Sequence, residues 1–419
     1  MKRPPVTLTS VLLAAFAASA FAGTQKPAAL QRPAAPAGAP RSAQSTVAPA
    51  LYSGPPPQAP LAFPGVPAPP VLEQQAAYVL MDATTGAIIA QKAPDLAWPP
   101  ASLTKLMTAY LTYQAIARGT IQLDQAVPIS VAAWHTGGSR MFISPNMTVS
   151  VDELLHGLII DSGNDAAVAL AQAVAGNRGS FVGLMNHEAQ VLGLTGTHYT
   201  NVDGLPDPDL HTTAMDVARL SRAILQTYPQ YLKISIQKHY TYNNIRQRNW
   251  NPVLFHDATV DGLKTGLTKE AGHCIDATAI RNGRRLIAVV LGGPTWTAST
   301  HDIEALLDYG YQFYTNATVI APGKAVGTLS APTYRETSVP VAPARGVTMT
   351  IPSLALQKLK TDLVLDPPPP AGVRRGQTVG TLSVSVDGKA LASVPVVAVA
   401  DDPRAGFFEL LLRRVKAAL

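Results

Sequence analysis

Three short polar motifs contain the side chains of this chain that are best suited to nucleophilic chemistry. The first is PPASLTKLMTAY, in which Ser102 and Lys105 lie three positions apart, just after two prolines. One helical turn places both side chains on the same face, so Lys105 could act as the base for the Ser102 hydroxyl. Serine also caps many helices whose next lysine faces water, so this spacing is weak by itself.

Two further motifs strengthen the chemical interpretation. In DSGNDAA, Ser162 and Asn164 lie between two apolar segments and could turn a hydroxyl and an amide into a common cleft. In DGLKTGLT, Lys264, Thr265 and Gly266 lie on a predicted strand. A lysine inside a sheet strand indicates a function, because burying an ammonium without an anionic partner is costly. Gly266 has no side chain, so a substrate backbone could lie along this strand.

Together these motifs match the S-x-x-K, S-x-N and K-T-G set of the penicillin-binding proteins and related β-lactamases. In the mechanism that we predict, Ser102 is the nucleophile and Lys105 is its base. A helix N-terminus and the neighbouring Lys264 should lower the pKa of Lys105 and make a neutral amine accessible. Ser162 should relay a proton toward the leaving amine.

The remaining motif residues are predicted to bind the substrate. Lys264 and Thr265 could hold a carboxylate by charge and hydrogen bonding, with Asn164 and Gly266 lining the same cleft. The backbone amides of Ser102 and of Leu267, just past K-T-G, would form the oxyanion hole.

These motifs require a mixed scaffold. Helical patterns cover Ala101 to about Arg118, the two segments on either side of DSGN, Asp216 to Leu225, and STHDIEALLDYGYQFYT. Strand patterns include two around TTG, then KHYTYNN, DGLKTGL, HCIDATAI and RRLIAVVLGG, with hairpin turns at TKEAG and RNG. The mixture predicts an α+β fold with helices packed against an antiparallel sheet.

The chain divides into five predicted segments by composition. The N-terminus has the pattern of a signal peptide: a basic n-region with Lys2 and Arg3, an apolar stretch and a small-residue cleavage site. A Pro/Ala-rich tether follows it. From about Val319, short β-branched runs between prolines and glycines predict a small all-β domain. The segments are a signal peptide (1–22), a linker (23–72), a catalytic domain (73–318), a β-rich domain (319–402) and an amphipathic helix (403–419).

The last segment, RAGFFELLLRRVKAAL, places its apolar side chains on one broad helical face and basic groups opposite. A basic amphipathic end with two phenylalanines suits weak attachment to the outer face of a membrane, aided by anionic lipid. The alternative is a helix that packs on the β-rich domain.

Composition excludes several classes of function. The net charge of +6 over 419 residues is mild, and the basic residues form no dense run with aromatic neighbours, so we expect no nucleic-acid binding. The single cysteine, Cys274, allows no intramolecular disulfide and is expected to be a small buried residue. The histidines lack zinc-peptidase spacing. Asp203 and Asp261 are interpreted as turn residues.

Residues 76–314 resemble the catalytic domain of the D-alanyl-D-alanine carboxypeptidases, the low-molecular-mass penicillin-binding proteins. The resemblance extends beyond the three motifs to AAYVLMDATTGAIIAQKAPD and TYNNIRQ. It implies a peptidoglycan stem peptide as substrate, loss of the terminal D-alanine through a Ser102 acyl-enzyme, and acylation by β-lactams. It also implies no metal or organic cofactor, and a periplasmic enzyme attached peripherally to the inner membrane.

Two positions depart from the family pattern. Leu267 replaces a histidine that many relatives carry after K-T-G, and Trp250 replaces an arginine between two asparagines. Recognition of the terminal carboxylate could therefore be altered, unless Arg248 compensates. The alternatives are a D,D-endopeptidase that cuts cross-links, a serine β-lactamase, which would need a deacylating base not found here, and a non-catalytic wall-binding homologue.

Overall fold

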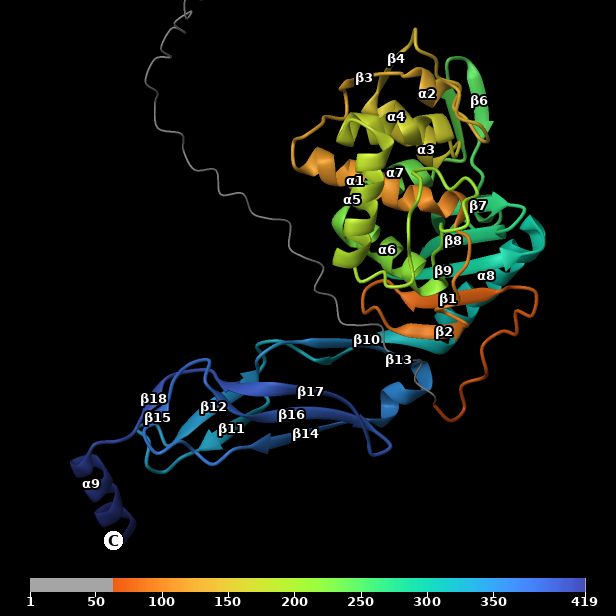
Figure 1. The fold of residues 1–419 in the computed structure, drawn as a ribbon. Helices are drawn as coiled ribbons and strands as arrows, with labels where there is room; N and C mark the ends of the chain where they lie inside the picture. The colour runs from red at the N-terminus through yellow and green to blue at the C-terminus, as the bar shows by residue number, and fades with distance from the viewer. Residues whose placement is uncertain (1–62, 419) are drawn as a thin grey trace, which may run out of the picture. The chain divides into compact units, whose positions relative to one another are not determined.

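The computed structural model describes residues 63–418 (Figure 1). The predicted signal peptide (1–22) and most of the predicted linker (23–72) lie outside the described residues.

A five-stranded antiparallel sheet forms the centre of the α+β region, with strand order β2-β1-β9-β8-β7. Short turns join β1 to β2 and β7 through β8 to β9, as the TTG, TKEAG and RNG patterns predict. Strand β7 contains the K-T-G motif and lies at the edge of the sheet, so its outer side has no strand neighbour there. The strands are β1 (Ala77–Asp82), β2 (Ile88–Lys92), β7 (Val260–Thr268), β8 (Gly272–Arg281) and β9 (Arg284–Gly293).

Both faces of this sheet are covered by helices, which explains why its strands read as nearly continuous apolar runs. Side chains alternate between the faces with a period of two residues. On β9, Ile287, Val289 and Leu291 enter the larger core, while Leu286, Ala288 and Val290 enter the core beneath α8.

The helices confirm the predicted pattern and add to it. The predicted helical hairpin is α3 and α4, which end and begin on either side of DSGN. The sequence pattern did not indicate α5, which buries few apolar side chains, or the single-turn α7. The helices are α1 (Lys105–Ala117), α2 (Val131–Trp134), α3 (Val151–Ile159), α4 (Asn164–Ala175), α5 (Arg178–Val191), α6 (Ala214–Thr227), α7 (Tyr231–Ser235) and α8 (Trp296–Phe313).

Small elements complete the α+β region. Strands β3 and β4 pair with each other, as do β5 and β6, and two short 3-10 helices precede α1 and β7. These are β3 (Ala126–Pro128), β4 (Thr148–Ser150), β5 (His239–Tyr242), β6 (Ile245–Arg248), η1 (Ala101–Thr104) and η2 (Pro252–Phe255).

The region after α8 is built from strands, as its β-branched runs predict. A five-stranded sheet of order β11-β12-β17-β16-β14 is accompanied by the pairs β10–β13 and β15–β18. The strands are β10 (Tyr314–Ile320), β11 (Gly327–Ser330), β12 (Ser338–Pro343), β13 (Val347–Pro352), β14 (Leu359–Leu365), β15 (Gly372–Val373), β16 (Thr378–Val386), β17 (Lys389–Ala398) and β18 (Asp402–Pro403). A 3-10 helix, η3 (Ser353–Lys358), connects β13 to β14.

Helix α9 (Phe407–Ala418) follows this region and begins four residues later than the predicted segment. Its apolar face is exposed: Phe407 and Phe408 are 75% and 78% exposed. Arg413 donates hydrogen bonds to the carbonyls of Tyr334 and Arg335, so one side of the helix contacts the β-rich region. Over residues 63–418, no helix combines the length and the apolar character needed to cross a membrane.

Candidate active site

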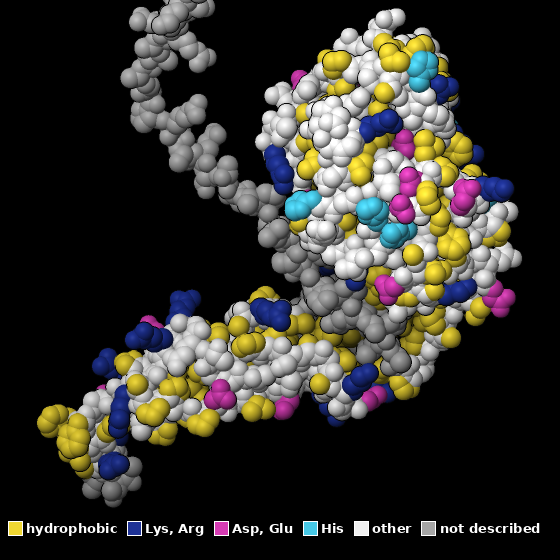
Figure 2. Space-filling view, in the orientation of Figure 1, with side chains coloured by type: hydrophobic (Ala, Val, Ile, Leu, Met, Phe, Trp, Pro, Cys, Tyr) yellow, Lys and Arg dark blue, Asp and Glu magenta, His cyan; other side chains and the backbone are white. Residues whose placement is uncertain are grey.

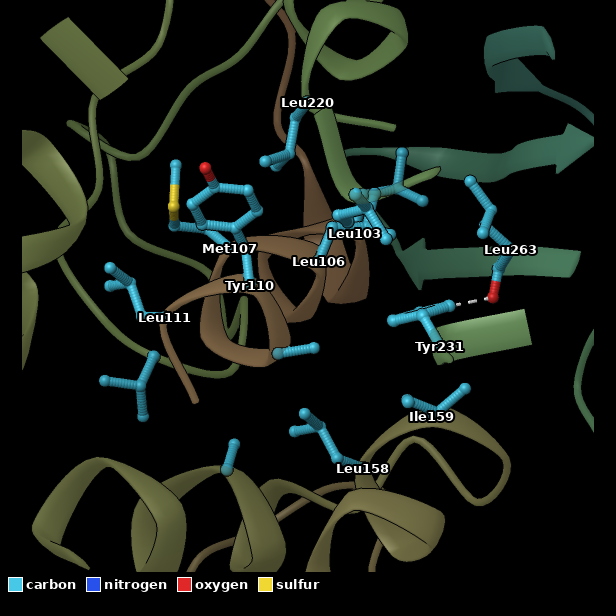
Figure 3. Close-up of a cluster of buried hydrophobic side chains, with 14 of the residues drawn as sticks. Leu103, Leu106, Met107, Tyr110, Leu111, Leu158, Ile159, Leu220, Tyr231 and Leu263 are labelled. Atoms are coloured by element: carbon cyan, nitrogen blue, oxygen red, sulfur yellow. Dashed lines mark hydrogen bonds between the residues drawn. The ribbon is translucent and has the colours of Figure 1, made fainter. Parts of the chain in front are cut away.

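The helix that follows Ser102 is fixed in the larger core. Nearly every side chain of α1 is buried. Figure 3 shows its apolar side chains packed against neighbours from α3, α6 and β7, and the Tyr231 hydroxyl of α7 donates to the Leu263 carbonyl of β7 at 3.4 Å. The labelled residues include Leu106, Met107, Tyr110, Leu111, Leu158, Ile159 and Leu220. This packing fixes the Ser102 turn relative to the K-T-G strand.

Ser102 lies in the 3-10 helix η1, which leads directly into α1, so the helix predicted from Ala101 begins with a 3-10 turn. The preceding residue, Ala101, has a φ of 45°, in the left-handed region. The loop 201–211 presses against this turn. Gly204, with a φ of 85°, lies so close that a Cβ there would be 1.8 Å from the Ala101 carbonyl oxygen. Only glycine fits this approach, which fixes the turn from outside the helix.

Lys105 is 1% exposed and is directed at the Ser102 hydroxyl. Its Nζ lies 2.8 Å from Ser102 Oγ and donates to the backbone carbonyl of Asp203 at 2.5 Å. Burial lowers the pKa of Lys105 to about 8, while the carboxylates of Asp203 and Asp165 oppose that shift. The lowered pKa agrees with our expectation, and its largest cause is burial.

The second serine and the second lysine form a matching pair. Lys264 is 2% exposed, and its Nζ donates to Ser162 Oγ and to the Thr265 carbonyl, both at 3.0 Å. Burial lowers the pKa of Lys264 well below its usual value, and the charge of Lys105 lowers it further. Ser162 has a φ of 57°, a left-handed conformation between α3 and α4 that turns its hydroxyl toward β7.

Asn164 opens α4, and its side chain contacts the loop that covers this end of the helix. Its Nδ2 donates to the Gly137 carbonyl at 2.7 Å, while its Oδ1 is buried without a hydrogen-bond partner in the described part of the chain. The next residue, Asp165, accepts hydrogen bonds from the amides of residues 141–143 and of Ala166. The Asp165 carboxylate therefore holds residues 141–143 against the S-x-N turn.

Asp161 is a buried acid that our reading of the sequence missed. It immediately precedes Ser162 and is 1% exposed, and neither carboxylate oxygen has a hydrogen-bond partner among residues 63–418. Burial raises the pKa of Asp161 to about 7; the charge of Asp165 raises it further, and the Lys264 ammonium lowers it. The sequence offered one sign of this role: Asp161 lies in the same short polar motif as Ser162 and Asn164, between two apolar helices.

The K-T-G strand lies close to the Ser102 turn. A Cβ at Gly266 would lie 2.8 Å from the Pro100 carbonyl and 3.2 Å from the Ser102 amide, so β7 and η1 approach closely. Thr265 is 3% exposed, and its side chain has no hydrogen bond to the described residues. Leu267 is 45% exposed at the outer end of the strand.

The two departures from the family pattern have different surroundings. Trp250 is 46% exposed, and its Nε1 donates to the Asp161 carbonyl at 3.2 Å. Arg248 lies over the Phe255 ring, with its guanidinium carbon 3.8 Å from the ring centroid. Its charge is therefore directed to that ring.

Asp203, Asp261 and Cys274 lie in three different surroundings. Asp203 shapes a turn, as expected, by accepting from the Leu205 amide at 3.1 Å. Asp261 is not in a turn: it lies in β7 and forms an ion pair with Arg285 at 2.7 Å. Cys274 is fully buried, as expected of a small apolar residue.

Comparison with known proteins gives consistent matches. A family described as D-alanyl-D-alanine carboxypeptidase, peptidase S11, matches residues 66–295, and the C-terminal domain of penicillin-binding protein 5 matches residues 314–404. The D-alanyl-D-alanine carboxypeptidase DacC of Escherichia coli is 38% identical over 340 residues, which cover 79% of this chain and 85% of that protein.

Solved structures show the same similarity. Penicillin-binding protein 5 from Haemophilus influenzae superposes with a TM-score of 0.73 at 34% identity, covering 81% of this chain and all of that one. Penicillin-binding protein D2 from Listeria monocytogenes, solved in its ampicillin-bound form, gives a TM-score of 0.54 at 29% identity. That match covers 58% of this chain and 100% of the other.

Proposed function

Because the chain belongs to the D-alanyl-D-alanine carboxypeptidase family of serine peptidases, we propose that Ser102 is the residue acylated by its substrate. The chain is a serine-type D-Ala-D-Ala carboxypeptidase. The observation that supports Ser102 as its nucleophile is the 2.8 Å contact of its hydroxyl with the buried amine of Lys105.

In the acylation step, neutral Lys105 accepts the hydroxyl proton while Ser102 Oγ bonds to the penultimate D-alanine carbonyl carbon. The amides of Ser102 and Leu267 stabilise the oxyanion. The carbon–nitrogen bond then breaks, and the proton taken up by Lys105 passes through the Ser162 hydroxyl, which contacts Lys264, to the leaving amine, so Lys105 becomes neutral again. Hydrolysis of the acyl-enzyme by water, with Lys105 again as base, releases the shortened peptide.

The substrate carboxylate changes the charge balance of the two lysines. Without substrate, burial and the mutual repulsion of Lys105 and Lys264 disfavour two ammonium groups in the same site. A terminal carboxylate next to Lys264 and Thr265 favours the charged form of Lys264. Binding would therefore leave Lys264 as the cation and Lys105 as the neutral base, with Asn164 and Gly266 lining the cleft.

A labelled penicillin and a pentapeptide test this assignment. The protein should be labelled covalently, Ser102→Ala should abolish labelling without unfolding, and the unaltered enzyme should release D-alanine from a pentapeptide. Labelling that persists in Ser102→Ala would refute the assignment of the nucleophile. Cleavage of cross-linked muropeptides without release of D-alanine would instead favour the D,D-endopeptidase alternative.

The location of the enzyme is a separate proposal. The charged and apolar pattern of residues 1–22 is typical of a cleaved signal peptide, which supports export to the periplasm. The exposed apolar face of α9 supports peripheral attachment to the outer face of the inner membrane. Deleting residues 407–419 should move the protein from the membrane to the soluble fraction. An unchanged distribution would favour a helix that only packs on the β-rich region.

A further inference from the structure

A cavity of about 470 Å³ beside the K-T-G strand takes no part in the mechanism proposed above. Trp250, Pro252 and Trp296 line it, together with the polar side chains of residues 247–249. The 3-10 helix η2, which begins at Pro252, packs into the core beneath α8, whereas the Ser102 turn packs into the larger core. The cavity therefore lies on the other side of β7 from the nucleophile.

Two indole rings flank the reactive part of β7. Trp250 donates to the carbonyl of Asp161, the residue before the S-x-N turn, at 3.2 Å. The Trp296 ring packs edge-on against the His273 ring, with centroids 4.8 Å apart, and His273 pairs with Leu267 between β7 and β8. Figure 2 shows hydrophobic side chains at the surface of the α+β region where Figure 1 labels β7 and β8. A ligand in this cavity would therefore lie next to a peptide bound along β7.

The polar lining determines which ligands the cavity can hold. The Arg248 guanidinium lies flat over the Phe255 ring and forms no ion pair with any of residues 63–418, so the N–H donors along its edge are free. Gln247 donates through Nε2 to the Arg140 carbonyl at 3.0 Å, which leaves its Oε1 as an acceptor. No acidic side chain is among the described residues that line the cavity. This lining favours a neutral or anionic ligand with several hydrogen-bonding groups over a cation.

A sugar ring combines the two kinds of surface that this cavity offers. Its flat C–H faces can pack on indole rings, while its hydroxyl and N-acetyl groups can hydrogen-bond with amide and guanidinium groups. Trp250 is 46% exposed, and its hydrogen bond to Asp161 already fixes the orientation of the ring. A preformed wall of this kind loses little conformational entropy when a ligand binds.

The proposed substrate brings such sugars close to the cavity. In the proposed mechanism the stem peptide leaves the reaction site past the outer end of β7, near Trp296. Three residues connect the D-Ala-D-Ala pair of a stem pentapeptide to the amino sugar, and an extended chain of three residues spans about 10 Å. This length takes the sugar clear of Ser102 and onto the neighbouring surface.

We propose that the cavity between Trp250 and Trp296 binds an N-acetylated amino sugar of the glycan strand that carries the stem peptide. The inference rests on the proposed function and adds a second part of the substrate that the enzyme recognises. The enzyme therefore acts more efficiently on stem peptides that are still attached to glycan than on free peptides.

Peptide-free sugars test binding directly. One probe is the tetrasaccharide of alternating N-acetylglucosamine and N-acetylmuramic acid, and the other is the uncharged tetrasaccharide of N-acetylglucosamine alone. Both should bind the full protein in isothermal titration calorimetry. Trp296→Ala should weaken both affinities roughly three- to tenfold, as expected for the loss of one aromatic contact, whereas Trp296→Phe keeps a flat ring and should retain most of the affinity. Arg248→Gln should weaken binding of the muramic probe most, because its carboxylate faces the guanidinium.

Trp134→Ala is the matched control, because Trp134 is 42% exposed on α2 and does not line the cavity. Its affinities for both sugars should equal those of the unaltered protein. Failure of both tetrasaccharides to bind overturns the proposal. Affinities that are unchanged in a folded Trp296→Ala, Arg248→Gln double variant overturn it as well.

Release of D-alanine tests whether this binding serves the reaction. The kcat/KM for a pentapeptide attached to its disaccharide should exceed that for the free pentapeptide, and the double variant should lower this ratio toward one. Equal values for the two substrates in the unaltered enzyme overturn the proposal. If penicillin labels Ser102 but neither substrate releases D-alanine, the proposed function fails, and the sugar titrations alone then decide the inference.

Discussion

The rate of acylation by a labelled penicillin should follow the titration of Lys105. Burial lowers the pKa of this amine from 10.5 to about 8. At pH 7, about one Lys105 in ten is then neutral, against about one in three thousand for a lysine of pKa 10.5. The difference corresponds to roughly 3 kcal/mol in favour of the neutral base.

Because the neutral amine is the active form, the rate should increase with pH. The second-order rate constant of labelling, measured between pH 5.5 and 9.5, should rise about tenfold from pH 6 to pH 7 and level off above about pH 9. Thermal unfolding at each pH separates this titration from loss of the folded protein. Asp203→Asn removes a charge that raises the pKa of Lys105, so its midpoint should shift to lower pH.

Two results would refute this reasoning. A midpoint near pH 4 to 5 would identify a carboxylate as the base, since unperturbed acids titrate there. A Lys105→Ala variant that is labelled at the rate of the unaltered protein at pH 7 would show that no base is needed from this position. In either case, the contact between Lys105 and Ser102 would be structural.

Three further perturbations have defined outcomes. Gly204→Ala inserts a Cβ 1.8 Å from the Ala101 carbonyl oxygen, so the rate of penicillin labelling should fall about 100-fold while circular dichroism stays native; a normal rate would show that this loop does not fix the nucleophile. Asp161→Asn removes a charge that raises the pKa of Lys264, and Asp161 itself titrates at about 7. The variant should therefore raise the KM for pentapeptide at pH 8 but not at pH 6, and an equal change at both would argue against charge coupling. Burial raises the pKa of Asp276 from 3.8 to about 8, so the folded protein holds a proton that the unfolded chain releases, and stability falls as pH rises between these values. In urea unfolding, Asp276→Asn should gain stability over the unaltered protein by more than about 1 kcal/mol between pH 5 and pH 8, whereas a constant difference would show that Asp276 titrates normally.

Residues whose role follows from their own side chain could be predicted from the sequence. The sequence itself shows a lysine in a predicted strand, Lys264, and a serine three residues before a lysine, Ser102 and Lys105. Burial in the fold then lowers the pKa values of both lysines, as the chemistry requires. Long apolar periodicities likewise indicated the helical hairpin of α3 and α4 and the strands of the central sheet, because both faces of that sheet are covered.

Features that depend on the backbone could not be predicted from the residue types. Lys105 donates to the backbone carbonyl of Asp203. Every residue has such a carbonyl, so the residue type at position 203 does not predict this contact. The 3-10 turn at Ser102 packs closely against Gly204, about 100 residues away in the chain. Asp207 and Glu270 come from segments about 60 residues apart, and only the tertiary fold brings them to one cavity.

The chain's single cysteine makes the substrate-binding strand accessible to direct measurement. Cys274 on β8 pairs with Gly266 on β7, is fully buried, and has a thiol pKa raised by burial to about 12. A thiol reagent can reach it only when this part of the sheet opens. The rate of modification therefore reports the opening of the K-T-G strand with no engineered probe. Comparing that rate before and after acylation by a β-lactam measures how strongly a bound acyl group closes the sheet edge.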